Sequence, residues 1–215
     1  MTGKRLLINA GPTQEPIDPV RFISNYSSGK MGIAIADAAA EYGAQVELVL
    51  GPVKIIPYNN SVKIINVITA GSMAKECIAR FPDCDIAILA AAVADFYPEK
   101  IEEKKIKRHG NNLIMKLKPT KDIAEILGNS RKKSQFIAGF ALETQEGIAN
   151  AVAKLKRKKL DMIVLNSLQD QGAGFGGDSN KITIIDKNNN IDKFELKSKK
   201  EAARDILDKI ISMIA

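Results

Sequence analysis

Short apolar segments alternate with segments of helical period through most of this chain, and that alternation limits the fold more than any other feature. The apolar runs of strand length in the first half are residues 5–10, 46–50, 62–68 and 86–92. Helical patterns lie between them at residues 29–42 and 69–80, and Thr69 is suited to cap the second. The alternation predicts an α/β fold: a Rossmann-like, mostly parallel sheet with helices on both faces.

The second half of the chain continues this pattern after a charged interruption. Residues 97–110 are dense in Lys and Glu, which predicts a mobile charged flap after the fourth strand. The further elements expected are strands at residues 112–117, 136–140 and 161–166, helices at 121–127 and 145–159, a C-terminal hairpin over 181–196 and a last helix at 199–214. A glycine-rich loop at residues 171–178 precedes the hairpin. We find no domain-scale linker, so residues 1–215 are predicted to form a single domain.

Composition limits the class of protein. The formal net charge of +7 is compatible with binding nucleic acid or small polyanionic substrates. The absence of Trp and the presence of only four Tyr weaken the case for a surface that stacks single-stranded bases. Cys77 and Cys84 match neither a disulfide framework nor a metal-ligand spacing, and no apolar run approaches a signal peptide or a membrane span. We therefore expect a cytoplasmic protein that does not enter a membrane.

The stretch from Ser24 to Gly32 places amide, hydroxyl, glycine and lysine groups together at the start of the first helix. The hydroxyls of Ser27 and Ser28 are suited to cap that helix, and the glycines let a ligand approach the N–H groups of its first turn. We interpret the stretch as an anion-binding turn; a helix start that binds no ligand is the alternative. The string is neither a Walker A loop nor a G-x-G-x-x-G turn.

Two loops beside the predicted sheet carry further polar groups. Residues 11–27 show no convincing period and contain Thr13, Glu15, Asp18 and Arg21. A structureless connection of that length is usually functional or disordered, and we favour a functional role. After the fourth strand, small side chains in residues 90–94 leave room at the carboxyl end of the sheet, where open α/β sheets bind ligands, and Asp95 follows them.

The residue inventory excludes several mechanisms. The single His, His109, lies in the flap without a G-x-S-x-G motif, and no Cys/His pattern supports a zinc site, so no metal site built from side chains is predicted. Lys154 and Lys158 share one helix face, where they are suited either to clamp a polyphosphate or to favour the helix C-terminus. Lysines, an asparagine and backbone donors suit phosphoryl or nucleotidyl transfer, in which Mg²⁺ accompanies the nucleotide.

A set of motifs is spread over essentially the whole chain. The motifs are Ala10-Gly11-Pro12-Thr13, Glu15-Pro16, Asp18-Pro19-Val20-Arg21-Phe22-Ile23-Ser24-Asn25, Ser27-Ser28-Gly29-Lys30-Met31-Gly32, Ala91-Ala92-Val93-Ala94-Asp95, Lys105-Ile106-Lys107 and Gly139-Phe140-Ala141-Leu142-Glu143-Thr144. Together they resemble phosphopantothenate-cysteine ligase. The resemblance implies a ligase of coenzyme A biosynthesis that joins 4'-phosphopantothenate to L-cysteine. The acid would first react with a nucleotide, CTP in most bacterial members and ATP as the alternative, releasing pyrophosphate. Cysteine would then displace CMP from the acyl-cytidylate.

The same resemblance implies roles for individual residues. Asn25 corresponds to the asparagine needed for the second half-reaction, and Lys105 to the flap lysine needed for activation, with Lys104 as the alternative register. The implied nucleotide-binding residues are Ala90, Ala91, Asp95, Lys105, Lys121, Asp122, Ile123, Ala124, Phe140, Lys154 and Lys158. The implied phosphopantothenate-binding residues are Arg21, Asn25, Ser28, Gly29, Lys30 and Ala92.

The resemblance also carries expectations about partners and cofactors. It implies a homodimer with Arg21 close to the subunit boundary, Mg²⁺ bound with the nucleotide, and no flavin. The chain begins at the first ligase strand, so a stand-alone form is expected. Two rival classes remain open. An NAD(P)-dependent Rossmann oxidoreductase would share the sheet but needs a glycine-rich first turn, and a basic nucleic-acid-binding module would use the lysine clusters and bind with steep salt dependence.

Overall fold

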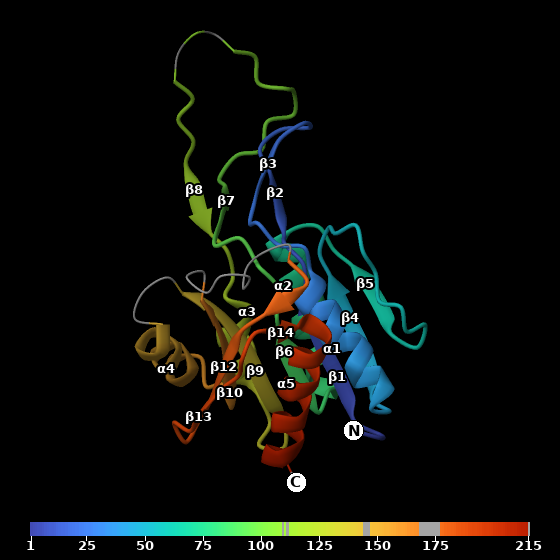
Figure 1. Cartoon of the computed structure of the whole chain (residues 1–215). Coiled ribbons are helices and arrows are strands. Elements are labelled where there is room, and N and C mark those ends of the chain that lie inside the picture. Colours follow the sequence, from blue (N-terminus) through green and yellow to red (C-terminus); the bar gives the residue numbers. More distant parts are fainter. Residues whose placement is uncertain (109, 111, 144–146, 168–176, 215) are drawn as a thin grey trace.

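A central eight-stranded sheet organises the computed structural model, which describes the whole chain except residues 109, 111, 144–146, 168–176 and 215 (Figure 1). The strand order is β13-β12-β10-β9-β6-β1-β4-β5. The parallel strands are β1 (Arg5–Ala10), β4 (Gln45–Leu50), β5 (Lys63–Asn66), β6 (Ile86–Leu89), β9 (Phe136–Glu143) and β10 (Met162–Ser167). Strands β12 (Ile182–Asp186) and β13 (Ile191–Lys193) continue the sheet in antiparallel pairing. The predicted fold class and the C-terminal hairpin are confirmed.

The chain changes direction across the sheet between β1 and β6. From β1 it moves outward through β4 to β5, then returns to the other side of β1 and moves outward again through β9 and β10. Open α/β sheets bind ligands at such a switch point, outside the carboxyl ends of the strands. The topology therefore marks the carboxyl edge of β1 and β6 as the place to look for a site.

Two apolar cores lie on opposite faces of the sheet because successive side chains of a strand point to opposite faces. Leu6 and Ile8 of β1 pack toward α1 (Lys30–Glu41) and α5 (Lys199–Ile214), which lie side by side in Figure 1. Leu7 points to the other core, beneath α2 (Ala70–Arg80), α3 (Ile123–Ser130) and α4 (Gly147–Arg157). In the part of the chain that the structure describes, no helix is long and apolar enough to cross a membrane.

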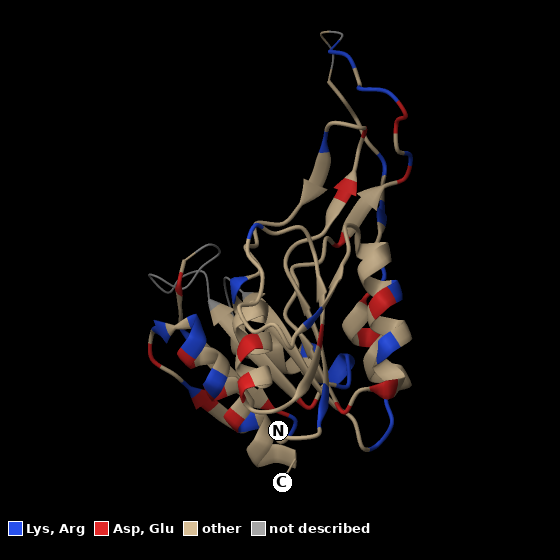
Figure 2. Cartoon of the chain, turned by 90° about the vertical axis from the view of Figure 1, so that its right-hand side faces the viewer, with Lys and Arg blue, Asp and Glu red and all other residues tan. Residues whose placement is uncertain are grey.

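An arm rises from the carboxyl edge of the sheet and stands clear of it in both views (Figures 1 and 2). It consists of the hairpin of β2 (Gln14–Pro16) and β3 (Phe22–Ser24), together with residues 96–119, whose ends pair as β7 (Phe96–Pro98) and β8 (Leu117–Pro119). Both basic and acidic residues, coloured blue and red on the ribbon, occur along the arm (Figure 2). The shortest elements are η1 (Phe81–Asp83), β11 (Ser179–Asn180) and β14 (Lys197–Ser198).

The structure corrects several predicted boundaries. Residues 112–116 form no strand, because only Leu117–Pro119 reaches a partner, β7. Residues 11–27 are not structureless, since they contain the β2–β3 hairpin. The fourth strand ends at Leu89 rather than at residue 92, and the third covers only Lys63–Asn66. His109, the helix start at residues 145–146 and residues 171–176 of the glycine-rich loop lie outside the described residues. Mobility of the flap stays a prediction.

Asp18 fastens the two parts of the arm to each other. Its buried carboxylate accepts hydrogen bonds from the N–H groups of Val20 (2.8 Å), Arg21 (2.9 Å) and Ile106 (3.1 Å), and from the Arg21 guanidinium. Arg21 Nη2 also donates to the Ile106 carbonyl oxygen at 2.9 Å. The Arg21 guanidinium holds the pKa of Asp18 well below its usual range. Burial of the carboxylate opposes this effect, and the backbone N–H donors add to it.

Gly32 allows the first turn of α1 to pack directly on the end of β1. A Cβ at this position would lie 2.5 Å from the Ala10 Cβ and 3.3 Å from the Asn9 carbonyl oxygen. Gly32→Ala is therefore expected to lower the free energy of unfolding by about 1–3 kcal/mol through overpacking, as measured by urea denaturation. Gly71→Ala in α2 is the matched control, because its Cβ would meet only Thr69 Oγ1 at 3.8 Å. Equal stability of the two variants would contradict this packing.

The hydrogen bonds of the Asp18 carboxylate to Val20, Arg21 and Ile106, called the Asp18 clamp here, are expected to limit the access of proteases to the arm. Asp18→Asn keeps one acceptor oxygen and loses the charge, so limited proteolysis at pH 7 is expected to cut residues 99–116 several times faster than in the unchanged protein. Because the folded pKa lies below the unfolded value of about 3.9, the ionised clamp is complete above that pH and is lost only as the pH falls toward the folded pKa. Glu102→Gln is the control, since its pair with Lys100 is exposed. Equal cleavage of both variants would contradict the clamp.

Candidate active site at the carboxyl edge of the sheet

Hydrogen bonds join the loops that leave β1 and β6. Residues 90–94 donate four N–H groups to the end of β1 and the segment that follows it: Ala90 to the Asn9 carbonyl oxygen (3.2 Å), Ala91 to Asn9 Oδ1 (2.9 Å), Ala92 to the Gly11 carbonyl oxygen (2.9 Å) and Ala94 to Thr13 Oγ1 (3.0 Å). Asn9 and Thr13 are buried. Residues 9–13 and 90–94 therefore form one fixed surface at the switch point, called the floor below. Asn9 was not among the predicted site residues.

Asn25 closes this floor from the side of the arm. Its Nδ2 donates to the carbonyl oxygens of Ala92 (3.3 Å) and Val93 (3.0 Å). On the opposite side, Thr120 Oγ1 donates to the Ala94 carbonyl oxygen at 2.7 Å. The Asn25 side chain itself is exposed, so it holds the floor while remaining open to a ligand.

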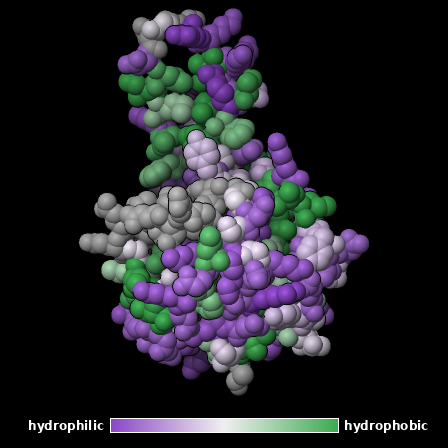
Figure 3. Space-filling view, viewed as in Figure 1, coloured by the Kyte–Doolittle hydropathy of each residue, from purple (hydrophilic) through white to green (hydrophobic). Residues whose placement is uncertain are grey.

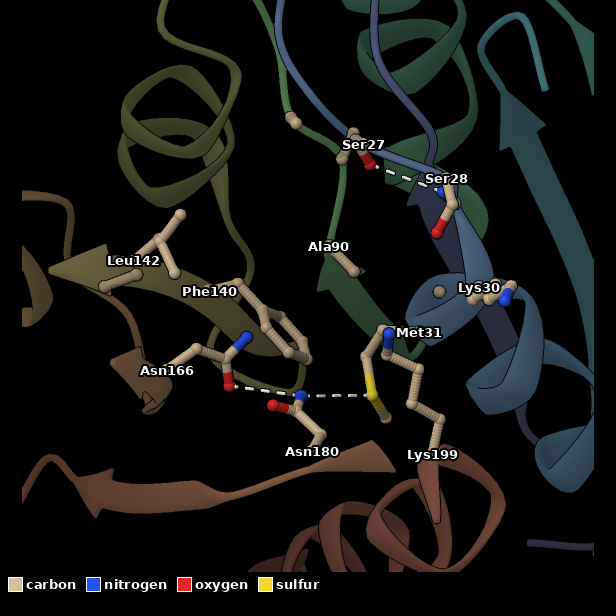
Figure 4. Close-up of a pocket in the computed structure, with 15 residues that line it drawn as sticks. Ser27, Ser28, Lys30, Met31, Ala90, Phe140, Leu142, Asn166, Asn180 and Lys199 are labelled. Atoms are coloured by element: carbon tan, nitrogen blue, oxygen red, sulfur yellow. Dashed lines mark hydrogen bonds between the residues drawn. The ribbon is translucent and has the colours of Figure 1, made fainter. Parts of the chain in front are cut away.

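Two hollows open at this floor. The first, the α1 pocket, lies on the α1 and α5 side of the sheet (Figure 4). Its lining is Ser27, Ser28, Gly29, Lys30, Met31, Gly32, Ala90, Ala91, Ala92, Phe140, Ala141, Leu142, Asn166, Asn180 and Lys199. In Figure 4, Phe140 and Asn166 stand opposite the start of α1, and Lys199 reaches up from α5.

The start of α1 presents backbone N–H groups to the α1 pocket. Its N-cap is Gly29, with φ 73° and no side-chain cap, so the predicted capping by the Ser27 and Ser28 hydroxyls is wrong. Ser27 Oγ instead accepts from the Gly29 N–H at 3.3 Å. The left-handed conformation suits glycine, and N–H groups at a helix start attract anions. The predicted anion-binding turn thus has the backbone geometry that such a turn requires.

Two lysines and two asparagines supply polar side chains to the α1 pocket. Lys30 Nζ lies 2.6 Å from Asp178 Oδ1, and Lys199 is 9% exposed. Asn180 Nδ2 donates to Asn166 Oδ1 at 3.3 Å and contacts Met31 Sδ at 3.6 Å (Figure 4). Lys199, Asn166 and Asn180 come from the last third of the chain, and no local pattern in the sequence connects them with the start of α1.

The second hollow, the α3 pocket, lies on the α3 and α4 side of the sheet. Its polar lining includes Asn9, Ser24, Asn25, Asp95, Thr120, Lys121, Asp122, Lys154 and Lys158, and its apolar lining includes Phe96, Ile123, Ala124, Leu160 and Ile163. Lys158 Nζ lies 2.9 Å from Asp122 Oδ2, and Asp122 caps α3 by accepting from the Glu125 N–H at 3.1 Å. Burial raises the pKa of Asp122, but the bonds from Lys158 and Glu125 outweigh it, so that pKa lies below its usual value.

The two pockets share a common wall. Ala91, Ala92, Phe140 and Leu142 line both of them. Two ligands bound on opposite faces of the sheet would therefore meet over small side chains at its edge. This arrangement suits a reaction between two substrates, each held by its own pocket.

The structure brings most of the predicted site residues to these pockets. Ser28, Gly29, Lys30 and Ala90 line the α1 pocket; Asn25, Asp95, Lys121, Asp122, Ile123, Ala124, Lys154 and Lys158 line the α3 pocket; Ala91, Ala92 and Phe140 line both. Arg21 and Lys105 lie elsewhere, in a groove on the arm with Ile106, Lys107, Arg108, Asn112 and Leu113. Within one chain, these two residues are not brought to either pocket.

The polar side chains of residues 11–27 act mainly on the protein's own backbone. Thr13 accepts from Ala94, Asp18 fastens the arm, and Glu15 Oε1 accepts from the Ala70 N–H at 2.8 Å. Glu15 is buried at the start of α2, where a carboxylate interacts favourably with the helix dipole. The loop therefore positions the floor and the arm, a role that the sequence interpretation did not specify.

Comparison with known proteins identifies the family. A family model described as "DNA/pantothenate metabolism flavoprotein C-terminal domain" matches residues 1–214. A protein from an unknown prokaryotic organism, named cysteine/cysteine sulfinic acid decarboxylase, is 60% identical over 214 residues, which are 100% of this chain and 60% of that protein. The coenzyme A biosynthesis bifunctional protein CoaBC of Bacillus subtilis (strain 168) is 41% identical over 213 residues, 99% of this chain and 52% of that protein. The chain thus spans little more than half the length of these curated relatives.

Solved structures agree with this assignment. The crystal structure of the C-terminal domain of CoaBC has a TM-score of 0.85 and 38% sequence identity, and the match covers 100% of this chain and 97% of that one. A DNA/pantothenate metabolism flavoprotein from Streptococcus pneumoniae shares the fold, with a TM-score of 0.85, 22% identity and coverage of 98% and 100%. This chain belongs to the family of the DNA/pantothenate metabolism flavoprotein C-terminal domain.

Proposed function

We propose that this chain joins 4'-phosphopantothenate to L-cysteine through an acyl-nucleotide, as a ligase of coenzyme A biosynthesis. The observation that carries the proposal is the shared wall of the α1 and α3 pockets, over which an acid and a nucleotide would meet. The sequence motifs of the ligase family and the relatives named as coenzyme A biosynthesis proteins support it. CTP is the expected nucleotide and ATP the alternative.

The nucleotide is assigned to the α3 pocket. Residues 121–124, at the start of α3, offer backbone groups and an apolar surface to the base, and Asp95 offers acceptor oxygens for ribose hydroxyls. Lys154 and Lys158 provide ammonium groups for the phosphates. In the described residues, no three His, Cys, Asp or Glu side chains are grouped to hold a metal ion. Mg²⁺ would instead enter the α3 pocket bound to the triphosphate, where it would neutralise part of the phosphate charge.

Phosphopantothenate is assigned to the α1 pocket. Its phosphate fits the N–H groups at the start of α1, beside Ser28 and Lys30. The carboxylate at its other end would then extend toward Ala92 and Asn25, where the two pockets meet. The acid would thus reach the α-phosphate of a nucleotide in the α3 pocket.

The proposed chemistry needs positioned donors rather than a titrating base. A carboxylate oxygen attacks the α-phosphorus, the new C–O–P linkage forms, and the bond to the β-phosphate breaks to release pyrophosphate. The cysteine nitrogen then attacks the carbonyl carbon, the amide forms, and the C–O bond breaks to release CMP while the amine proton passes to solvent. Both transition states gather negative charge, which fixed ammonium and amide groups stabilise. We assign this role to the ammonium groups of the α3 pocket and to the Asn25 amide, which lies at the same pocket.

A homodimer is part of the proposal, because the arm carries residues that a single chain does not bring to its own pockets. Arg21 and Lys105 line the arm groove, and large apolar side chains are exposed along the arm, where apolar side chains appear green in Figure 3. These are Val20, Phe22, Phe96, Ile101, Leu113, Ile114 and Leu117. Exposed apolar patches of this kind mark protein interfaces. A second copy that covers the arm would bring Lys105 to the pockets of its partner.

A product assay tests the function directly. The purified chain is incubated with Mg²⁺, 4'-phosphopantothenate, L-cysteine and either CTP or ATP, and the products are identified by mass spectrometry. The expected products are phosphopantothenoylcysteine, pyrophosphate and the nucleoside monophosphate in equal amounts. Absence of the amide with both nucleotides would refute the proposal. Thermal stabilisation by NAD or by duplex DNA alone would favour one of the rival classes.

Asn25→Asp is expected to separate the two half-reactions. The substitution keeps the size of the side chain but removes the donor that bonds the Ala92 and Val93 carbonyl oxygens. Pyrophosphate release in a single turnover is expected to continue, while amide formation falls about a hundredfold, the effect of about 3 kcal/mol in the barrier. The acyl-cytidylate should therefore accumulate. Full turnover by the variant would remove Asn25 from the mechanism.

Lys105→Gln is expected to suppress pyrophosphate release about a hundredfold, since it removes one charge-assisted contact to the transferring phosphates. Lys104→Gln is the matched control on the neighbouring residue; if it alone has this effect, Lys104 is the activating lysine. Mixing the inactive Lys105→Gln and Asn25→Asp proteins tests the dimer. A heterodimer contains one complete site if Lys105 acts in the partner's pocket, so activity should return on mixing. Continued inactivity after confirmed subunit exchange would place Lys105 in its own chain's site.

A further inference from the structure

Lys199 occupies a position that helix stability does not explain. It is the first residue of α5, where the helix dipole disfavours a cation, and only 9% of it is exposed. Lysine is seldom buried to this degree unless its ammonium group is paired. The surface of α5 offers many exposed positions for lysine. The burial of Lys199 at the start of the helix must therefore be explained by the residues around it.

The surroundings of Lys199 are those of the α1 pocket. Its side chain extends from α5 past Met31 toward the start of α1 (Figure 4). Its Nζ donates to the Gly177 carbonyl oxygen, and its backbone N–H donates to the Asp178 carbonyl oxygen at 2.9 Å. A carbonyl oxygen is a neutral partner, and in the described part of the chain no carboxylate forms an ion pair with the Lys199 ammonium group.

Positive charge accumulates on this side of the pocket. Burial lowers the pKa of Lys199, the charge of Lys30 acts in the same direction, and the Asp178 carboxylate opposes them only in part. The Asp178 side chain is 91% exposed and pairs with Lys30 from the solvent side. The N–H groups at the start of α1 add further positive potential to the same hollow. A bound anion would interact favourably with all three groups at once.

We propose that Lys199 is a phosphate-binding residue of the α1 pocket, which holds a phosphoryl group together with Lys30 and the first turn of α1. The identity of the phosphate carrier rests on the proposed function. It is either the phosphate of 4'-phosphopantothenate or the terminal phosphates of a nucleotide that extends from the α3 pocket across the shared wall. Both carriers would present one or two phosphates to Lys199. Inorganic pyrophosphate is therefore used as the probe, because its binding can be measured without any reaction taking place.

Binding measurements on charge variants test this assignment. Affinities for inorganic pyrophosphate, 4'-phosphopantothenate and CTP are measured by calorimetry at constant ionic strength. Lys199→Met is expected to bind pyrophosphate at least about tenfold more weakly, since a buried charge-assisted contact is lost. Lys200→Met is the matched control with the same charge change: its ammonium lies 3.8 Å from Glu41 Oε1 and 5.3 Å from the Tyr58 ring centroid, outside the α1 pocket. Its affinities should change less than about twofold, because exposed charges are screened.

The three ligands distinguish the possible phosphate carriers. They also separate the assignment of Lys199 from the proposed ligase function. A loss confined to phosphopantothenate assigns Lys199 to that substrate, and a loss confined to CTP assigns it to the nucleotide. If the unchanged protein binds pyrophosphate through Lys199 but neither substrate, the proposed function fails and the phosphate site stands. Unchanged affinity for all three ligands, or an equal loss in Lys200→Met, would overturn the proposal.

A measurement on the unchanged protein covers the case in which Lys199→Met fails to fold. The lysine Cε resonances of ¹³C-labelled protein are titrated with and without pyrophosphate, and Lys199 is identified with the charge-conserving Lys199→Arg variant. Pyrophosphate is expected to raise the pKa of Lys199 and to leave that of Lys200 unchanged. A pKa of Lys199 that does not respond to pyrophosphate would overturn the proposal.

Discussion

The hydrogen bonds between the end of β1, the segment that follows it and the segment that follows β6 hold the candidate site together. At the switch point the chain leaves the sheet on both strands, and the N–H groups of Ala90, Ala91, Ala92 and Ala94 would lose their partners if the loops separated. Buried backbone donors must be satisfied, so Asn9 and Thr13 supply side-chain oxygens where the strand pairing ends. Because both pockets use Ala91 and Ala92, a shift of this floor would disturb the two sites together.

The two pockets at this edge of the sheet differ in the charged groups that line them. The α1 pocket combines Lys30, Lys199 and the start of α1, whereas the α3 pocket sets Lys154 and Lys158 against Asp95 and Asp122. A pocket with excess positive charge suits a phosphate monoester or pyrophosphate, and one with both signs suits a nucleotide with a ribose and a base. The proposed ligase reaction requires this division, since its steps depend on holding anions in contact rather than on moving protons.

The sequence predicted the fold and many of the residues that line the two candidate pockets, because local patterns encode both. Alternating apolar runs define the parallel strands, and the glycines and Lys30 beside the first helix indicate an anion site before any contact is known. Lys199 and Asn180 were missed, because nothing near them in the chain distinguishes them from ordinary surface residues. Only the packing of α5 on α1 and the pairing of β11 with β14 bring them to the α1 pocket. The strands of the arm are three residues long, and β2, β7 and β8 each contain a proline, so they carry too little period to be recognised.

The account depends most on the claim that the acid is activated by direct attack on the nucleotide at the shared wall. This can be followed with 4'-phosphopantothenate that carries ¹⁸O at both carboxylate oxygens, incubated with the protein, Mg²⁺, L-cysteine and the active nucleotide. The account predicts one ¹⁸O atom in the nucleoside monophosphate for each amide formed and none in pyrophosphate. Amide formation with an unlabelled nucleoside monophosphate would contradict it.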